Sequence, residues 1–392
     1  MSPDPAITPD DREVNTVATT RTRRRRRHAH PVATLGSAPA DEVLEAAFGP
    51  LVPRPFGGIL AVAVDETGPH TWTAGTWTTL PPLTNGAPGG ASPCVTGVPA
   101  DGGPVFQIGS ITKVFTATLL AQAVATGEVE LDGPVEDVLA VPLRVGGRPV
   151  TLRDLVSHRS GLPRVPHGMR RHVDRKDPYR TMDTARLLRA VAEHRDRVRA
   201  GRDAAPRYSN FGFAVLGLAL ARSLGTSWEQ ALTERVLLPA GLTATAAPTA
   251  MAAPRAVLVG RGGRPVPPWD LAAFAPAGGL WMSGPDLAAW LGLLTEAVRP
   301  GPADGPAAGP RDAVLAATRM TLVPQVRTWR AQIGMAWHFF ERDGVAWHNG
   351  GVLGASSFVG VDQRNARAVG VFALGNPRAA LDRAAMRGLT GR

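Results

Sequence analysis

The sequence predicts an α/β protein of the α+β kind, in which an antiparallel sheet is flanked by helices and a mainly helical region is inserted. Two observations predict this fold class. Strand-like stretches lie near both ends of the chain, and helical patterns dominate residues 151–250. We therefore expect the terminal strands to share one sheet, with the helical region packed beside it.

The chain begins with a segment unlike the rest. Residues 1–40 are polar, charged and Pro-containing, and we expect a disordered Arg-rich tail. Residues 41–392 are expected to form one folded domain, with its helical region at about residues 115–270. Within it, Asp41–Gly49 has the apolar spacing of a helix, and the next stretch predicts two strands around a turn at Glu66–Pro69.

A strongly apolar stretch, FQIGSITKVFTATLLAQAVATG, begins at Phe106. It predicts a helix from Ser110 to about Thr126 that ends at Gly127, and apolar residues on all its sides predict a central, buried position. Ser283 is the expected N-cap of a later helix. The C-terminal stretches predict an antiparallel meander closed by a helix.

The composition excludes several classes of partner and cofactor. The net charge is +10, but the run RTRRRRR carries six of these charges, so the body has no basic stripe and we expect no nucleic-acid partner. A solvated tail is the simpler interpretation of the run, and contact with acidic lipid or nucleic acid is the alternative. One cysteine excludes an intrachain disulfide, and His28 and His30 lack further ligands nearby, so we expect no metal.

The apolar content of the sequence also bears on the protein's location. No apolar run approaches the ~20 residues of a membrane span, so no transmembrane segment is expected. The stretch after the Arg run is too short and too broken by Pro and Gly for a secretory signal. We therefore expect a cytoplasmic protein, with export or membrane-surface association through the tail left open.

Lys113 is the first candidate for chemistry. The chain has 43 basic residues, and only Lys113 and Lys176 are lysines. Ser110 and Lys113 are three residues apart and so share one face of the expected helix. Burial lowers the pKa of a lysine, which can then take the proton of a serine nucleophile, whereas Arg stays protonated. The alternative is a helix-capping Ser110 beside a Lys113 that extends to the surface.

Two further stretches carry suitable side chains. Tyr208 and Asn210 stand just before an apolar helix, and a phenol beside an amine can relay a proton while an amide holds a carbonyl. The alternative is a plain helix cap. His348-Asn349-Gly350-Gly351 begins a further strand-like stretch, where glycines let a ligand approach the backbone and His348 can bond to it. Its alternative is a hairpin turn with a solvated histidine.

Other common catalytic patterns are missing from the sequence. There is no G-x-S-x-G, no H-E-x-x-H and no G-x-G-x-x-G, and neither lysine completes a P-loop. We therefore expect no cofactor.

The order S-x-x-K, Y-x-N, H-x-G resembles the serine β-lactamase-like family, which includes class C β-lactamases, D-Ala-D-Ala carboxypeptidases, D-aminopeptidases and related esterases. The resemblance covers about residues 50–385. It includes FQIGSITKVFTATLLAQAVATGEVELDGPVEDVL, VTLRDLVSHRSGLP and APAGGLWMSGPDLAAW. It implies a fold like that of β-lactamases and penicillin-binding proteins.

The resemblance also implies a role for each candidate residue. Ser110 would be the acylated nucleophile and Lys113 its base, and Tyr208 would relay protons to and from the leaving group. Asn210 would hold the acyl side of the substrate. The substrate-binding strand would be His348, Asn349, Gly350 and Gly351, with the backbone N–H groups of Ser110 and Gly351 as the oxyanion hole. His158 in SHRSGLP matches the family too, and we expect it to be structural.

Two departures from the family pattern decide which substrates we expect first. His348 stands where the lactamases have Lys, and Asn349 replaces a small hydroxyl residue that often holds a carboxylate. The resemblance implies acyl-enzyme hydrolysis of a small-molecule ester or amide. Esterase-like hydrolysis leads, D-Ala-D-Ala carboxypeptidase or D-aminopeptidase activity follows, and β-lactamase activity is third. A catalytically silent binding protein is the alternative of another class. Substrate identity and oligomeric state stay open.

Overall fold

The computed structural model describes residues 40–52, 57–80, 92–95, 103–169, 174, 176–247, 253–300, 308–328, 332–340, 344–375 and 378–391. Its main feature is an antiparallel sheet in the order β12-β13-β14-β15-β16-β17-β1-β2. The strands are β1 (Gly58–Asp65), β2 (Gly68–Gly75), β12 (Val326–Arg327), β13 (Gln332–Ile333), β14 (His338–Phe340), β15 (Val345–Val352), β16 (Ala355–Asp362) and β17 (Arg367–Leu374). Because β1 pairs with β17, the two ends of the fold share one sheet, as predicted.

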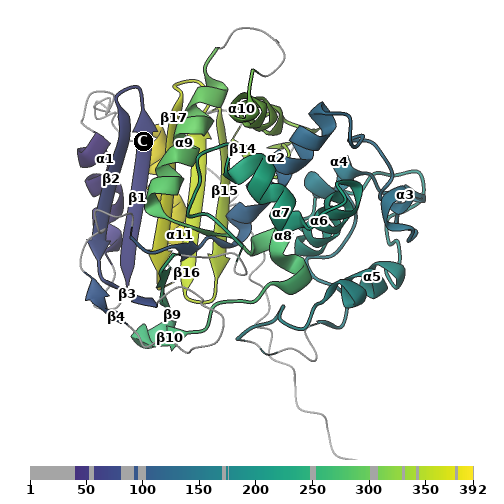
Figure 1. Cartoon of the computed structure of the whole chain (residues 1–392), viewed down its shortest axis with the longest axis horizontal. Helices are drawn as coiled ribbons and strands as arrows, with labels where there is room; N and C mark the ends of the chain where they lie inside the picture. The colour runs from purple at the N-terminus through teal and green to yellow at the C-terminus, as the bar shows by residue number, and fades with distance from the viewer. Residues whose placement is uncertain are drawn as a thin grey trace, which may run out of the picture. The chain divides into compact units, whose positions relative to one another are not determined.

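Both faces of this sheet are covered, which explains why β1 is buried along nearly its whole length. Successive side chains of a strand point to opposite faces. Ile59 packs with α1 (Ala40–Phe48) and α11 (Arg378–Thr390) on one face. Leu60 points to the other face, where α9 (Gly284–Val298) lies. Figure 1 shows α9 running along the sheet, with α2–α8 and α10 gathered on one side and α1 at the opposite edge.

The helical region lies between β2 and β12 in the chain. It contains α2 (Thr112–Ala125), α3 (Val135–Leu139), α4 (Leu152–Val156), α5 (Thr184–Ala192), α6 (Asn210–Ser223), α7 (Trp228–Leu232), α8 (Ala275–Gly278) and α10 (Pro310–Thr321). Short strands accompany them: β3 (Trp77–Leu80), β4 (Ser92–Val95), β5 (Phe106–Gln107), β6 (Arg144–Val145), β7 (Arg148–Pro149), β8 (Arg255–Ala256), β9 (Leu258–Val259), β10 (Pro265–Val266) and β11 (Trp281–Met282).

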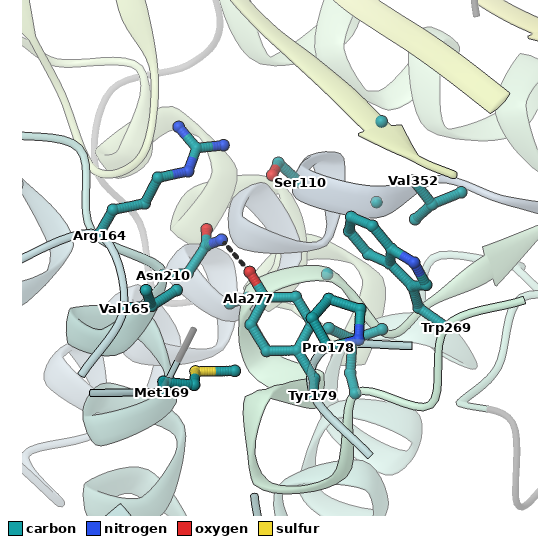
Figure 2. A pocket seen from close by; sticks show the side chains of 14 residues that line it. Ser110, Arg164, Val165, Met169, Pro178, Tyr179, Asn210, Trp269, Ala277 and Val352 are labelled. Atoms are coloured by element: carbon teal, nitrogen blue, oxygen red, sulfur yellow. Dashed lines mark hydrogen bonds between the residues drawn. The ribbon is translucent and has the colours of Figure 1, made fainter. Parts of the chain in front are cut away.

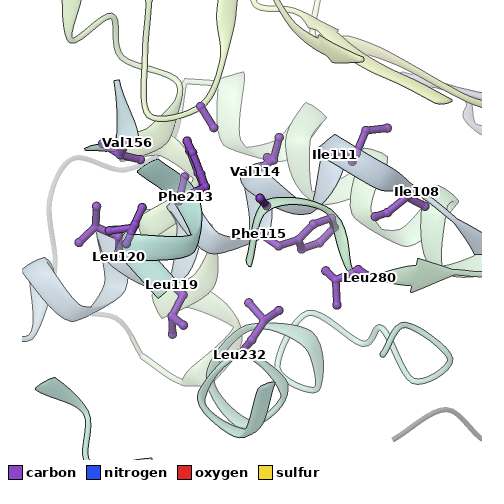
Figure 3. Close-up of a cluster of buried hydrophobic side chains, with 14 of the residues drawn as sticks. Ile108, Ile111, Val114, Phe115, Leu119, Leu120, Val156, Phe213, Leu232 and Leu280 are labelled. Atoms are coloured by element: carbon purple, nitrogen blue, oxygen red, sulfur yellow. The ribbon is translucent and has the colours of Figure 1, made fainter. Parts of the chain in front are cut away.

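Helix α2 is the centre of the main core. Eleven of its fourteen residues are buried, and Figure 3 shows Phe115, Leu119 and Leu120 projecting among side chains of α6 and α7. Phe115 also packs on Trp290 of α9, with ring centroids 4.4 Å apart. A helix that is apolar on every side needs neighbours on every side, and α2 has them.

Most expected elements are confirmed, and two differ. Ser283 accepts a hydrogen bond from the N–H of Asp286 and caps α9 as expected. The helix predicted to start at Ser110 starts at Thr112, because Gly109–Ile111 form a 3₁₀ turn, η2. The motif that begins with His348 lies in the second half of β15, since pairing with β16 starts at Val345.

Two expectations concern the tail and the membrane. The tail predicted for residues 1–40 lies, apart from its last residue, outside the described residues. Among the described residues, no helix has both the length and the apolar content needed to cross a membrane.

Candidate active site

The three sequence motifs meet where η2 touches β15. Gly109 has a φ of 54°, a conformation that glycine adopts easily. A Cβ on Gly109 would lie 2.7 Å from the backbone N of Gly351, and one on Gly350 would lie 2.2 Å from the carbonyl oxygen of Ile108. Side chains at either glycine would therefore push the strand away from the turn that carries Ser110.

Lys113 lies one turn after Ser110 and is completely buried. Its Nζ is 3.3 Å from Ser110 Oγ. It also donates to Asn210 Oδ1 at 2.8 Å and to the carbonyl oxygen of Ala277 at 2.6 Å. The amine thus joins η2, α6 and α8, which rules out the alternative of a Lys113 that extends to the surface.

These contacts suit a neutral amine. Burial lowers the pKa of Lys113 well below its usual value, and the nearby Arg164 cation lowers that pKa further. A neutral amine has two N–H bonds and one lone pair. In this neutral form, Asn210 Oδ1 and the Ala277 carbonyl oxygen accept the two N–H bonds and the lone pair can accept the hydroxyl of Ser110, whereas the protonated amine would donate to all three oxygens. The arrangement can therefore take the Ser110 proton.

Close packing of α6 against α8 brings both acceptors to Lys113. A Cβ on Gly217 of α6 would lie 2.0 Å from Cγ of Pro276 in α8, so a larger residue would separate the two helices. The start of α6 is fixed by Ser209, whose Oγ accepts from the N–H of Gly212 at 2.8 Å. The cap expected here is present, and it positions Asn210 as well.

Tyr208 lies among several basic groups. Its half-buried ring is 4.8 Å from Lys113 Nζ and 5.1 Å from the guanidinium carbon of Arg164. The ring of His158 lies 4.7 Å away, and that of His348 lies 6.2 Å away. Tyr208 therefore lies close to residues from α2, from β15 and from the segment that follows α4.

His158 has a structural position. Its Nδ1 accepts the backbone N–H of Ser209 at 3.2 Å, and its backbone has a φ of 61°. Burial is the main cause that lowers its pKa well below the usual value, so the ring stays neutral. His158 thus fixes the segment that carries Tyr208, in keeping with the expected role.

His348 is fully buried on β15 and does not line the cavity. Its Nδ1 lies 2.6 Å from the carbonyl oxygen of Asn349, so this nitrogen carries the proton. Its Nε2 has no hydrogen-bond partner among the described residues. Burial lowers its pKa well below the usual value, with help from His338, whose ring is 5.5 Å away. His348 is therefore a neutral imidazole.

Asn349 is directed away from Ser110. Its Nδ2 donates to Asp382 Oδ2 of α11 at 2.8 Å, on the far face of the sheet. Alternation along β15 explains this, since neighbouring residues of a strand face opposite sides. A predicted substrate-binding side chain thus holds α11 on the sheet.

A cavity of about 240 Å³ opens beside Ser110 (Figure 2). It is lined by Gly109, Ser110, Arg164, Val165, Met169, Pro178, Tyr179, Asn210, Trp269, Leu271, Ala277, Gly278, Gly351 and Val352. The lining therefore includes three of the predicted site residues, namely Ser110, Asn210 and Gly351. Lys113 lies behind this wall, in contact with Ser110 and Asn210.

Sequence reasoning missed four residues here. They are Arg164, Tyr179, Trp269 and His338. Tyr179 accepts a hydrogen bond from Asn210 Nδ2 at 2.9 Å, and its rarity was the one available signal, since the chain has two tyrosines. Trp269 is held through its backbone by Gln107, whose side chain bonds to its N–H and its carbonyl oxygen.

The chain is similar to known proteins of one family. The Beta-lactamase family model matches residues 88–389. Penicillin-binding protein 4 of Amycolatopsis lactamdurans is 31% identical over 301 residues, which is 68% of this chain and 71% of the relative. The D-alanyl-D-alanine-carboxypeptidase/endopeptidase AmpH of Escherichia coli is 30% identical over 197 residues, and this match spans 48% of each chain.

Solved structures show the same fold. A D-alanine carboxypeptidase AmpC from Burkholderia cenocepacia has a TM-score of 0.68 at 20% identity and covers 90% of this chain and 99% of its own. A class C β-lactamase from Rhodobacter sphaeroides has a TM-score of 0.67 at 20% identity, with 88% and 98% covered. With the family match and the Ser110–Lys113 contact, these findings show that the chain belongs to the Beta-lactamase family as a serine hydrolase.

Proposed function

We propose that this protein hydrolyses a small ester through an acyl-enzyme on Ser110, with Lys113 as the base. The observation that carries the proposal is the position of Lys113 Nζ, which is fully buried and lies 3.3 Å from Ser110 Oγ, so that in its neutral form it can take the hydroxyl proton. Serine needs such a base to become a strong nucleophile.

The proposed reaction has two halves. Ser110 Oγ attacks the ester carbonyl as Lys113 takes the hydroxyl proton, and a tetrahedral intermediate forms. The bond to the leaving oxygen then breaks, and that oxygen receives the proton through Tyr208, whose ring lies 4.8 Å from Lys113 Nζ. Water attacks the acyl-enzyme in the same way and releases the free acid and Ser110.

Backbone N–H groups of Ser110 and Gly351 are proposed to stabilise the oxyanion. Support comes from the contact of η2 with β15: a Cβ on Gly350 would lie 3.2 Å from the N of Ser110, and one on Gly109 would lie 2.7 Å from the N of Gly351. One such donor contributes about 10²–10³ in rate. Asn210 is proposed to orient Lys113 as well as the acyl group, since its amide bonds to both Lys113 and Tyr179.

The preference for esters rests on the third motif and on the cavity wall. His348 is neutral, and Asn349 is bonded to Asp382, so this motif offers a substrate neither a cation nor a hydroxyl. The cavity wall is rich in apolar and aromatic side chains such as Met169 and Trp269. A small apolar acyl group fits this apolar part of the wall.

A D-Ala peptidase is the second candidate. Two relatives favour it, because AmpH is named a D-alanyl-D-alanine carboxypeptidase and the relative from Amycolatopsis is named a penicillin-binding protein. Purified protein would be assayed with p-nitrophenyl esters of short and medium acids, with D-Ala-D-Ala peptides and with nitrocefin. We expect the highest kcat/KM with an ester. Higher kcat/KM on the peptides would overturn the ester preference and keep the acyl-enzyme.

The acyl-enzyme is tested separately. A fluorophosphonate should label the peptide that carries Ser110, and Ser110→Ala should lose this label. Label on Ser209 would show that Ser110 is not the nucleophile, and no label together with a silent assay would support a binding protein without catalysis.

A further inference from the structure

The cavity beside Ser110 has two chemically different ends. Figure 2 shows Arg164 on one side of Ser110 and Trp269 with Val352 on the other. Trp269 and Tyr179 lie with ring centroids 5.6 Å apart and make this end of the cavity aromatic. Among the described lining residues, Arg164 carries the one formal charge. A substrate with an apolar group and an anionic group would match both ends.

Arg164 is placed by its backbone and by Tyr208. Its carbonyl oxygen accepts the N–H of Phe211 at 3.1 Å, which ties its segment to the first turn of α6. Its guanidinium carbon lies 5.1 Å from the centroid of the Tyr208 ring. Arg stacks well on aromatic faces and keeps its N–H donors in the plane of the guanidinium. The side chain is thus held beside the site with donors at its rim.

Arg164 has no acidic partner within the described part of the chain. Other arginines near the helical region are paired, as Arg148 is with Asp154 and Arg153 with Asp132. The salt bridges of the described residues do not include Arg164, and no Asp or Glu lies among the cavity-lining residues. A guanidinium without a carboxylate beside a cavity is suited to bind one from a ligand.

We propose that Arg164 is a specificity-determining residue that binds a carboxylate on the leaving group of the substrate. The inference deepens the proposed acyl-enzyme reaction at Ser110 and rests on it. The leaving-group side is indicated because Arg164 packs on Tyr208, which passes the proton to the leaving oxygen. The apolar end, with Trp269 and Tyr179, then receives the acyl group. Arg164 thus supplies the cation that the neutral His348 lacks.

Matched esters test this assignment. The first pair is 4-acetoxybenzoate and its methyl ester, which differ by one carboxylate on the leaving group. A third ester joins methyl 4-hydroxybenzoate to succinate, so its carboxylate is on the acyl side. Release of the phenol is followed by absorbance. The ratio of kcat/KM within a pair, compared between variants, cancels the intrinsic reactivity of each ester.

We expect Arg164→Gln to lower kcat/KM for the anionic leaving group about tenfold relative to its methyl ester, as for a lost charge-assisted hydrogen bond. Arg164→Lys keeps the charge and should keep much of the preference. Arg189→Gln removes an exposed arginine outside the cavity and is the matched control, with an unchanged ratio. The neutral ester reports any general effect of Arg164 on Lys113. An unchanged ratio in Arg164→Gln, or a larger loss with the succinate ester, would overturn the proposal.

A binding measurement keeps the inference separate from turnover. In the Ser110→Ala background, calorimetry with 4-hydroxybenzoate and with its methyl ester measures recognition of the leaving group alone. Arg164→Gln should raise the Kd of the acid about tenfold and change that of the methyl ester much less. Equal effects on both ligands would refute the carboxylate site, even if ester hydrolysis is confirmed. A selective effect would support it even if the preferred reaction is of another kind.

Discussion

Lys113 and His348 are both fully buried basic side chains beside Tyr208, yet their surroundings differ. Lys113 reaches side chains and backbone of three elements, with Nζ–acceptor distances of 2.6 and 2.8 Å. His348 bonds to its own neighbour's backbone, and its Nε2 has no partner in the described structure. Burial lowers both pKa values, so burial alone does not select the base. The difference lies in position, since Lys113 Nζ is 3.3 Å from Ser110 Oγ and no hydrogen bond joins His348 to Ser110 among the described residues.

The largest loss of activity is expected at Ser110, the proposed nucleophile. Ser110→Ala removes the atom that becomes acylated, so ester turnover should fall by about 10⁴-fold or more. Covalent labelling should disappear as well. Thermal melts serve as the folding control, since the side chain of Ser110 has one hydrogen bond in the described structure, with Lys113. Residual turnover above a tenth of the parent rate would mean that another residue is acylated.

The next largest loss of activity is expected at Lys113. Its variants test whether this residue must release and take up a proton or only carry a positive charge. Lys113→Arg keeps the charge, but Arg stays protonated, so kcat/KM should fall by about 10²–10⁴. Lys113→Met removes the base and should cause a similar loss. Lys176→Arg changes the one other lysine, which is exposed, and should leave kcat/KM unchanged. A folded and active Lys113→Arg enzyme would refute Lys113 as the proton acceptor.

A smaller effect is expected at His348. His348→Gln keeps a side-chain N–H donor and replaces a neutral ring by a neutral amide. We therefore expect kcat/KM to fall about tenfold or less, the scale of one neutral hydrogen bond and of altered packing on Tyr208. Steady-state kinetics beside Lys113→Arg make the comparison direct. A loss as large as that of Lys113→Arg would show that His348 also transfers the proton.

The pH profile of kcat/KM sharpens the same comparison. Lys113 must be neutral to act, so activity should rise with pH through its pKa, which lies well below 10.5. The Arg164 cation is one cause of that low pKa. Removing it in Arg164→Gln raises the pKa of Lys113, so the acidic limb should move to higher pH. A limb that moves to lower pH, or stays in place, would show that another group sets it.

The motifs of this site were visible in the sequence because they are local. Ser110 and Lys113 are one turn apart, and Asn210 follows its cap, so spacing alone places them on helices. Tyr179 and Arg164 could not be found in this way. They stand in irregular segments, and their approach to Ser110 depends on how those segments fold over α6.

Strand alternation similarly limited what the sequence could predict about the third motif, which begins at His348. The sequence placed His348 and Asn349 together at the substrate. On β15 neighbouring residues face opposite sides, and Asn349 bonds to Asp382 of α11. His338, which lies on the neighbouring strand β14, packs on His348 with ring centroids 5.5 Å apart. Strand pairing between distant residues decides such contacts, and no motif in the sequence signals them.

The smallest expected effect is on stability, at the neighbour of His348. Burial is the main cause that lowers the pKa of His338 from 6.5 to about 4. Below pH 6.5 the unfolded chain binds a proton on His338 and the folded chain does not, which favours unfolding. The contribution of the neutral His338 to the free energy of unfolding is therefore fully present above pH 6.5. That contribution is lost progressively as the pH falls toward about 4.

Melting temperatures of the parent, His338→Gln and His167→Gln should therefore be measured at pH 7 and pH 4.5. His167 is exposed, so His167→Gln should lose as much Tm on acidification as the parent. His338→Gln should lose a few degrees less, because it has no proton to bind in the unfolded state. An equal loss in all three proteins would show that His338 is not kept neutral by folding. The burial shared by His338 and His348 would then not explain why His348 is neutral.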